Sequence, residues 1–76
     1  MERSLRLKGD AMDGFDIGAA RKREHITQKE MADAMNLTVP HIVAIERNNP
    51  LPPTPELVDM MLAAIDRIVT EKASAQ

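Results

Sequence analysis

The sequence predicts an all-α domain of four to five helices. Apolar residues recur at helical spacing along most of the chain, no β-branched run alternates with period two, and no Asn-Gly or Asp-Gly hairpin turn is present. At 76 residues the chain has room for one domain with a small core. We expect a flexible N-terminal arm over residues 1–12, a compact domain over 13–72 and a disordered tail over 73–76.

The composition argues against several classes of protein. There is no cysteine, and His25 and His41 are the only histidines, so we expect neither a disulfide nor a metal or other cofactor. A single aromatic residue, Phe15, argues against the stacking platforms of single-strand binders. A glycine-rich phosphate loop and a Ser/His/Asp grouping are both missing, so we do not expect an enzyme. Apolar runs are short, which predicts a cytoplasmic protein without a membrane segment.

The formal net charge of −2 is unfavourable for binding nucleic acid, because basic residues that neutralise phosphates supply much of the affinity. Acidic residues outnumber basic ones mainly over residues 50–76, which need not contact DNA. The basic residues form two clusters, Arg3/Arg6/Lys8 and Arg21/Lys22/Arg23. The first cluster is either a minor-groove arm or a disordered, solvated segment.

The first helix is predicted from Phe15 to Glu24, with Phe15, Ile17 and Ala20 on an apolar stripe. Asp13 or Asp16 lies near its start, and His25 at its C-terminal end.

Thr27 and Glu30 form a capping box that predicts the start of a second helix. Its buried face carries Met31, Ala32 and Met35. Asn36 tolerates a left-handed conformation and so ends this helix in a sharp turn, with Leu37 directed into the core.

Thr38 is the next N-cap, and Pro40 falls in the first turn, where a missing N–H costs nothing. The third helix therefore runs from Val39 to about Arg47 and ends at Asn48-Asn49-Pro50. A proline-rich connector leads to a last helix from Pro55 to about Lys72.

The last helix is apolar over more than half of its circumference, which exceeds what one small core is expected to cover. We therefore predict that residues 55–72 dimerise the protein; the alternative is that the stripe packs only on the chain's own helices. The predicted interface residues are Leu57, Met60, Met61, Ala64, Ile65 and Ile68.

Two capped helices joined by a turn of about three residues form the arrangement that sets a recognition helix in the DNA major groove. Residues 17–65 resemble the Cro/C1-type (lambda-repressor-like, XRE) helix-turn-helix family of phage and bacterial regulators. The matching residues are Ile26-Thr27-Gln28-Lys29-Glu30-Met31-Ala32, Asn36-Leu37-Thr38, Ile42, Ile45, Glu46 and Arg47.

The resemblance implies roles for individual residues. Gln28 would bind a phosphate, with Lys29 beside it, and Arg21 and Glu46 would form a structural ion pair. The positions at base edges and at the backbone near them are Thr38, Val39, Pro40, His41, Val43 and Ala44, and Arg47 and Asn48 would contact the backbone after the helix.

The sequence departs from the family pattern at the base-edge positions and in the turn after the first helix. Val39, Pro40 and Ala44 can offer only apolar contacts, for instance to thymine methyl groups, so specificity would rest on His41, Arg47, DNA shape and half-site spacing. His25 stands where the family usually carries glycine.

These observations predict a sequence-specific double-stranded DNA-binding regulator. We expect a dimeric autorepressor that blocks a promoter at an inverted-repeat operator, loosely resembling small phage autorepressors such as anti-CRISPR-associated regulators. The alternative is an antitoxin-like or adaptor module that binds a protein partner and touches DNA weakly. Salt dependence separates the two, because phosphate contacts weaken steeply as salt rises.

Overall fold

The computed structural model describes residues 12–75, which contain four helices and no strand. The helices are α2 (Gly14–Arg23), α3 (Gln28–Met35), α4 (Val39–Glu46) and α5 (Pro55–Ala75). This confirms the predicted all-α fold. The basic cluster Arg3/Arg6/Lys8 and nearly all of the predicted arm lie outside the described residues.

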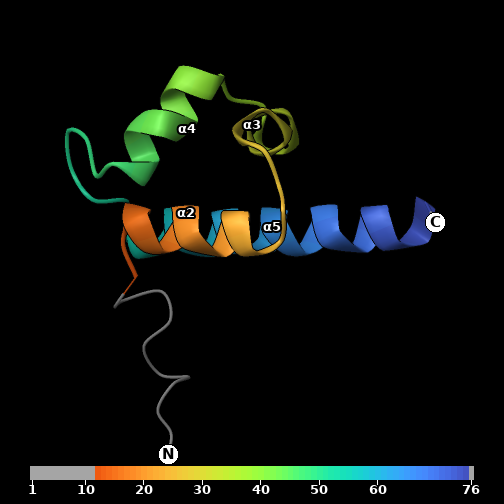
Figure 1. The fold of residues 1–76 in the computed structure, drawn as a ribbon. Helices are drawn as coiled ribbons and strands as arrows, with labels where there is room; N and C mark the ends of the chain where they lie inside the picture. Colours follow the sequence, from red (N-terminus) through yellow and green to blue (C-terminus); the bar gives the residue numbers. More distant parts are fainter. Residues whose placement is uncertain (1–11, 76) are drawn as a thin grey trace, which may run out of the picture.

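The helices form two layers. α2 lies alongside α5, and α3 and α4 pack against each other on one side of that pair (Figure 1). The core lies between the layers, and α5 supplies the largest share of it. The core residues are Ile17, Ala20, Ile26, Met31, Ala32, Ile42, Ile45, Val58, Met61, Ala64, Ile65 and Ile68.

Side-chain caps define where the first two helices start. At α2, Asp13 accepts a hydrogen bond from the Asp16 N–H at 3.2 Å, and Asp16 accepts one from the Asp13 N–H at 3.0 Å. At α3, Thr27 Oγ1 accepts from the Glu30 N–H at 3.0 Å, and Glu30 accepts from the Thr27 N–H at 2.8 Å. Each box satisfies donors that the helix leaves unpaired, as predicted for Thr27 and Glu30.

The other boundaries also follow local signals. Asn36 ends α3 in the left-handed conformation, at φ 60° and ψ 41°. Thr38 then accepts a hydrogen bond from the His41 N–H at 3.3 Å, which caps α4 with Pro40 in its first turn. His25, where the family usually has glycine, takes a positive φ of 60° in the turn after α2.

Two expectations about single segments were wrong. Phe15 does not join the apolar stripe of α2, because it lies about 200° around the helix from the buried Ile17 and is 64% exposed. Residues 73–75, predicted as part of a disordered tail, are the last turn of α5.

The predicted dimer interface also needs correction. Met61, Ala64, Ile65 and Ile68 are buried in the core of a single chain, because α5 packs on both α2 and α3. Contact with two helices accounts for the wide apolar stripe. Of the predicted interface residues, Leu57 is half-buried and Met60 is 60% exposed.

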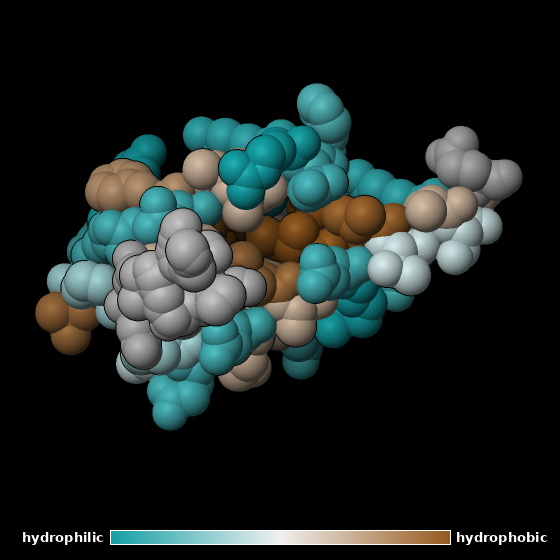
Figure 2. Space-filling model, turned by 90° about the horizontal axis from the view of Figure 1, so that it is seen from below, coloured by the Kyte–Doolittle hydropathy of each residue, from teal (hydrophilic) through white to brown (hydrophobic). Residues whose placement is uncertain are grey.

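Some apolar surface remains on the outside of this layer. Seen from the side of α2 and α5, the molecule shows hydrophobic surface between hydrophilic margins (Figure 2). No helix in residues 12–75 is both long enough and apolar enough to span a bilayer.

Candidate nucleic-acid interface

α3 and α4 form a tightly packed pair joined by residues 36–38. Ala32 of α3 is only 2% exposed, and its small side chain permits close packing in the core. The Leu37 N–H donates to the Ala32 carbonyl at 2.8 Å, which closes the turn behind the left-handed Asn36. The turn fixes the direction in which α4 leaves α3.

The predicted base-reading residues form the outer side of α4. Thr38, Pro40 and His41 are exposed, and Val39, Val43 and Ala44 are half-buried. Apart from Thr38 and His41, these side chains carry no hydrogen-bonding group. The face therefore offers mainly shape and apolar contact to a ligand.

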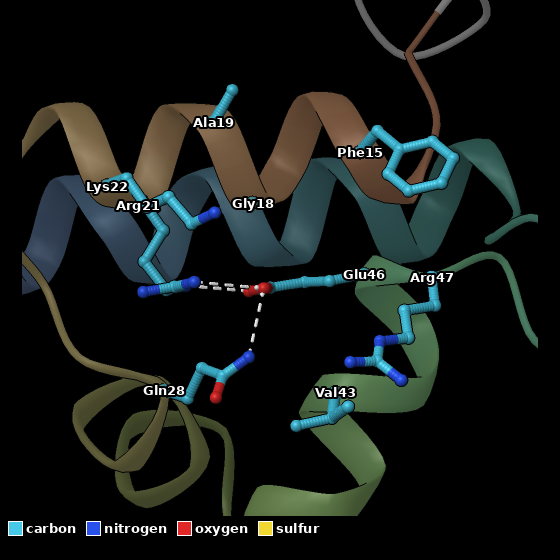
Figure 3. A pocket seen from close by; sticks show the side chains of 9 residues that line it. All are labelled: Phe15, Gly18, Ala19, Arg21, Lys22, Gln28, Val43, Glu46 and Arg47. Atoms are coloured by element: carbon cyan, nitrogen blue, oxygen red, sulfur yellow. Dashed lines mark hydrogen bonds and ion pairs between the residues drawn. The ribbon is translucent and has the colours of Figure 1, made fainter.

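An ion-pair network holds the end of α4 to the rest of the domain. Arg21 Nε donates to Glu46 Oε2 at 2.7 Å, and Arg21 Nη2 donates to Glu46 Oε1 at 3.0 Å, with both residues buried. Arg21 Nη1 also donates to the Ile26 carbonyl at 2.7 Å. Gln28 Nε2 donates to Glu46 Oε1 at 3.3 Å, so one carboxylate ties α2 and the start of α3 to α4 (Figure 3).

A family model described as helix-turn-helix matches residues 17–67, which is more than half of the chain. The chain belongs to this helix-turn-helix family. The match confirms the Cro/C1-type resemblance and makes the protein a DNA-binding transcription regulator in the general sense. No curated protein and no solved structure matches the chain.

Within this helix-turn-helix, the residues predicted to contact the DNA backbone differ in exposure. Lys29 is exposed at the start of α3, where it pairs with Asp33 at 3.2 Å. Gln28 is half-buried, and its side chain lies against Glu46. Arg47 is exposed immediately after α4.

Asn48, predicted to contact DNA, has its side chain bound within the domain. Its Oδ1 accepts from the Gly14 N–H at 2.7 Å, and its Nδ2 donates to Asp13 at 3.4 Å. The side chain therefore caps the start of α2 from 34 residues away. Nothing in the local sequence indicated this contact, because it depends on the close approach of α2 to the end of α4.

Sequence reasoning also missed two contacts from α5 to the ends of α3. Arg67 donates to the Ala34 carbonyl at 3.0 Å, near the C-terminus of α3. Lys72 pairs with Glu30 at 3.1 Å and donates to the His25 carbonyl at 3.4 Å, near the N-terminus of α3. A cation near a helix C-terminus is stabilising, which favours the Arg67 contact, and Lys72 holds the Glu30 carboxylate that caps the N-terminus of α3.

Glu30 makes the stability of the domain depend on pH. The hydrogen bond from the Thr27 N–H and the nearby Lys72 ammonium hold the pKa of the Glu30 carboxyl below its usual range. A depressed folded pKa means that the folded state favours the ionised carboxylate. This stabilisation is present above the unfolded pKa of about 4.3 and is lost as the pH falls through the lower folded value.

We therefore expect a Glu30→Gln variant to be less stable than the parent at pH 7, with the difference shrinking toward zero as the pH falls below about 4.3. Thermal unfolding followed by circular dichroism from pH 7 to pH 3 measures this difference. Glu71→Gln, which removes the same charge from an exposed position, is the control. A difference between Glu30→Gln and parent that stays constant with pH would contradict the assignment.

Proposed function

We propose that the protein is a dimeric repressor that binds an inverted-repeat operator with α4 in the major groove. The observation that carries the proposal is the outer face of α4, where Thr38, Pro40 and His41 are exposed on a helix held by the Arg21–Glu46 network. Lys29 in the first turn of α3 and Arg47 after α4 are both exposed cations, and we propose that they contact the flanking phosphates.

Fluorescence anisotropy tests the proposal. A labelled duplex from upstream of the gene and a scrambled duplex are each titrated with protein at several salt concentrations. We expect tight binding to the upstream duplex that is selective and weakens steeply with salt. Equal, weak binding to both duplexes would contradict the proposal.

The apolar face of α4 leads to a prediction about which bases it reads. The C5-methyl of thymine is the one apolar group on a base edge in the major groove, and Val39, Pro40 and Ala44 match it chemically. Replacing a contacted thymine with uracil removes this methyl and keeps every hydrogen-bonding group. We expect an affinity loss of about fourfold at each such thymine, from about 0.8 kcal/mol per methyl.

Single thymine-to-uracil substitutions across the mapped operator, measured by anisotropy, test this reading. Substitutions outside the half-sites are the control and should have no effect. Unchanged affinity at every thymine of the half-sites would contradict apolar reading by α4.

The proposed dimer uses the flanks of α5, because the centre of its stripe is occupied by the core. Met60 is 60% exposed beside the half-buried Leu57, and on the other flank Val69 is 36% exposed beside the half-buried Leu62. A two-fold dimer would match an inverted repeat whose half-sites lie about 34 Å apart.

Sedimentation equilibrium of the parent and of Met60→Glu tests the dimer. We expect the parent to dimerise and the charged variant to dissociate at lower concentration, with the monomer fold kept because Met60 is exposed. A parent protein that stays monomeric at high concentration would contradict the dimer.

Repression would follow from protein concentration, with the dimer blocking polymerase at its own promoter. A reporter driven by that promoter should fall as the protein is expressed and recover when residues on the outer face of α4 are changed. A reporter that is unaffected by those changes would argue against repression by this domain.

A second candidate is an antitoxin-like or adaptor module. The apolar outer face of α4 favours it, because Val39, Pro40 and Ala44 would also suit a protein surface. Hydrophobic association depends little on salt, so the same salt series separates this function from DNA binding.

A further inference from the structure

A groove of about 560 Å³ lies between α2, the first turn of α3 and the end of α4 (Figure 3). Gln28, Val43 and Arg47, which we assign to the DNA-facing side, line part of it. The rest of the lining includes Phe15 and Lys22 of α2, a helix outside the α3–α4 pair.

The buried charges in the lining of the groove cancel. Arg21 and Glu46 are both buried and paired at 2.7 Å, and the Gln28 amide donates to the same carboxylate. A ligand in the groove therefore meets a neutral, hydrogen-bonded surface there.

The exposed charges of the lining are positive. Lys22 on α2 and Arg47 after α4 are both exposed and belong to opposite walls of the groove. The N-terminus of α3, which opens on the same side at Gln28, adds a partial positive charge. The groove thus favours an anion.

Phe15 gives the groove an apolar contact beside these cations. It is the only aromatic residue of the chain, and it is 64% exposed with its side chain turned away from the core. A ligand that matches both features carries an anionic group next to an apolar ring, as the sugar-phosphate backbone of DNA does.

We propose that the groove binds the DNA backbone, with Lys22 on a phosphate and Phe15 packed against a neighbouring deoxyribose. The inference rests on the proposed function, because α4 in the major groove with Arg47 at its end brings the backbone to this groove. It adds α2 to the DNA interface as a second wall that fixes the register of the protein on the duplex.

The test measures the salt dependence of operator affinity, by anisotropy, for the parent, Lys22→Gln and Phe15→Ala. Loss of one phosphate contact makes the plot of log affinity against log salt less steep by about 0.9. Between 0.1 M and 1 M salt the variant should therefore lose about eightfold less affinity than the parent loses. We expect this from Lys22→Gln. Phe15→Ala should lose roughly threefold to tenfold in affinity at an unchanged slope.

Arg23→Gln is the matched control, because it removes one positive charge from the exposed neighbour of Lys22 in the last turn of α2, and Arg23 does not line the groove. It should leave both slope and affinity close to those of the parent. The unfolding midpoints of Lys22→Gln and Phe15→Ala should equal that of the parent, since both side chains are exposed.

The possible failures are distinguishable. If the parent binds the operator but Lys22→Gln keeps the parental slope and Phe15→Ala the parental affinity, the groove proposal is overturned and DNA binding by α4 stands. If the parent binds no duplex selectively, the proposed function fails and the groove proposal fails with it.

Discussion

A Gly14→Ala variant should lose about 3 kcal/mol of its free energy of unfolding. A Cβ at Gly14 would overlap the backbone carbonyl oxygen of Ile45 and would lie 2.8 Å from Asn48 Oδ1. Ile45 is a core residue at 7% exposure, so its backbone can move aside only by disturbing the end of α4. The gain in helix propensity from glycine to alanine, at most about 1 kcal/mol, is too small to offset this overlap.

Gly18→Ala is the matched control within the same helix. There the added Cβ would lie 3.1 Å from Glu46 Oε1, so the carboxylate would have to move by only a few tenths of an ångström, far less than the Ile45 carbonyl at Gly14. We expect Gly18→Ala to change the stability by less than about 1 kcal/mol, because helix propensity offsets the crowding. Urea unfolding of both variants measures the difference. A Gly14→Ala protein as stable as the parent would contradict the close approach of α2 and α4.

The helix boundaries could be predicted from the sequence because they depend on local chemistry. Thr27 and Glu30, three residues apart, satisfy each other's backbone donors wherever a helix starts. Asn36 adopts the left-handed conformation at low cost for the same local reason. These signals require no knowledge of which helices pack together.

The features that the sequence did not indicate depend on packing between distant segments. In the sequence Asn48 is a polar residue after a helix, and only the approach of α2 makes it a cap for Gly14. The stripe of α5 shows that a face is apolar but not what covers it, and Met61 and Ala64 prove to face the chain's own helices.

The pair of Arg21 and Glu46 was indicated only by resemblance to a family, since the two residues lie 25 positions apart.

The ion pair of Arg21 and Glu46 contributes strongly to stability because both residues are buried. A Glu46→Ala variant should lose about 3 to 5 kcal/mol, because it leaves the buried Arg21 guanidinium without its carboxylate. A small domain has a total stability of about 5 to 15 kcal/mol, so much of its stability is then gone. Replacing both partners with apolar residues, as in Arg21→Met with Glu46→Leu, removes the unpaired charge and should cost far less.

The double variant also separates stability from function. If the pair acts only through stability, Arg21→Met/Glu46→Leu should bind operator DNA like the parent under conditions where both are folded. We expect weaker binding, because Glu46 also holds the Gln28 amide at 3.3 Å and so links the first turn of α3 to the end of α4. Without that link the two parts of the proposed DNA-facing side are no longer held in register. Urea unfolding combined with anisotropy on the single and double variants measures both effects. Parental affinity in a folded double variant would show that apolar packing alone positions α4.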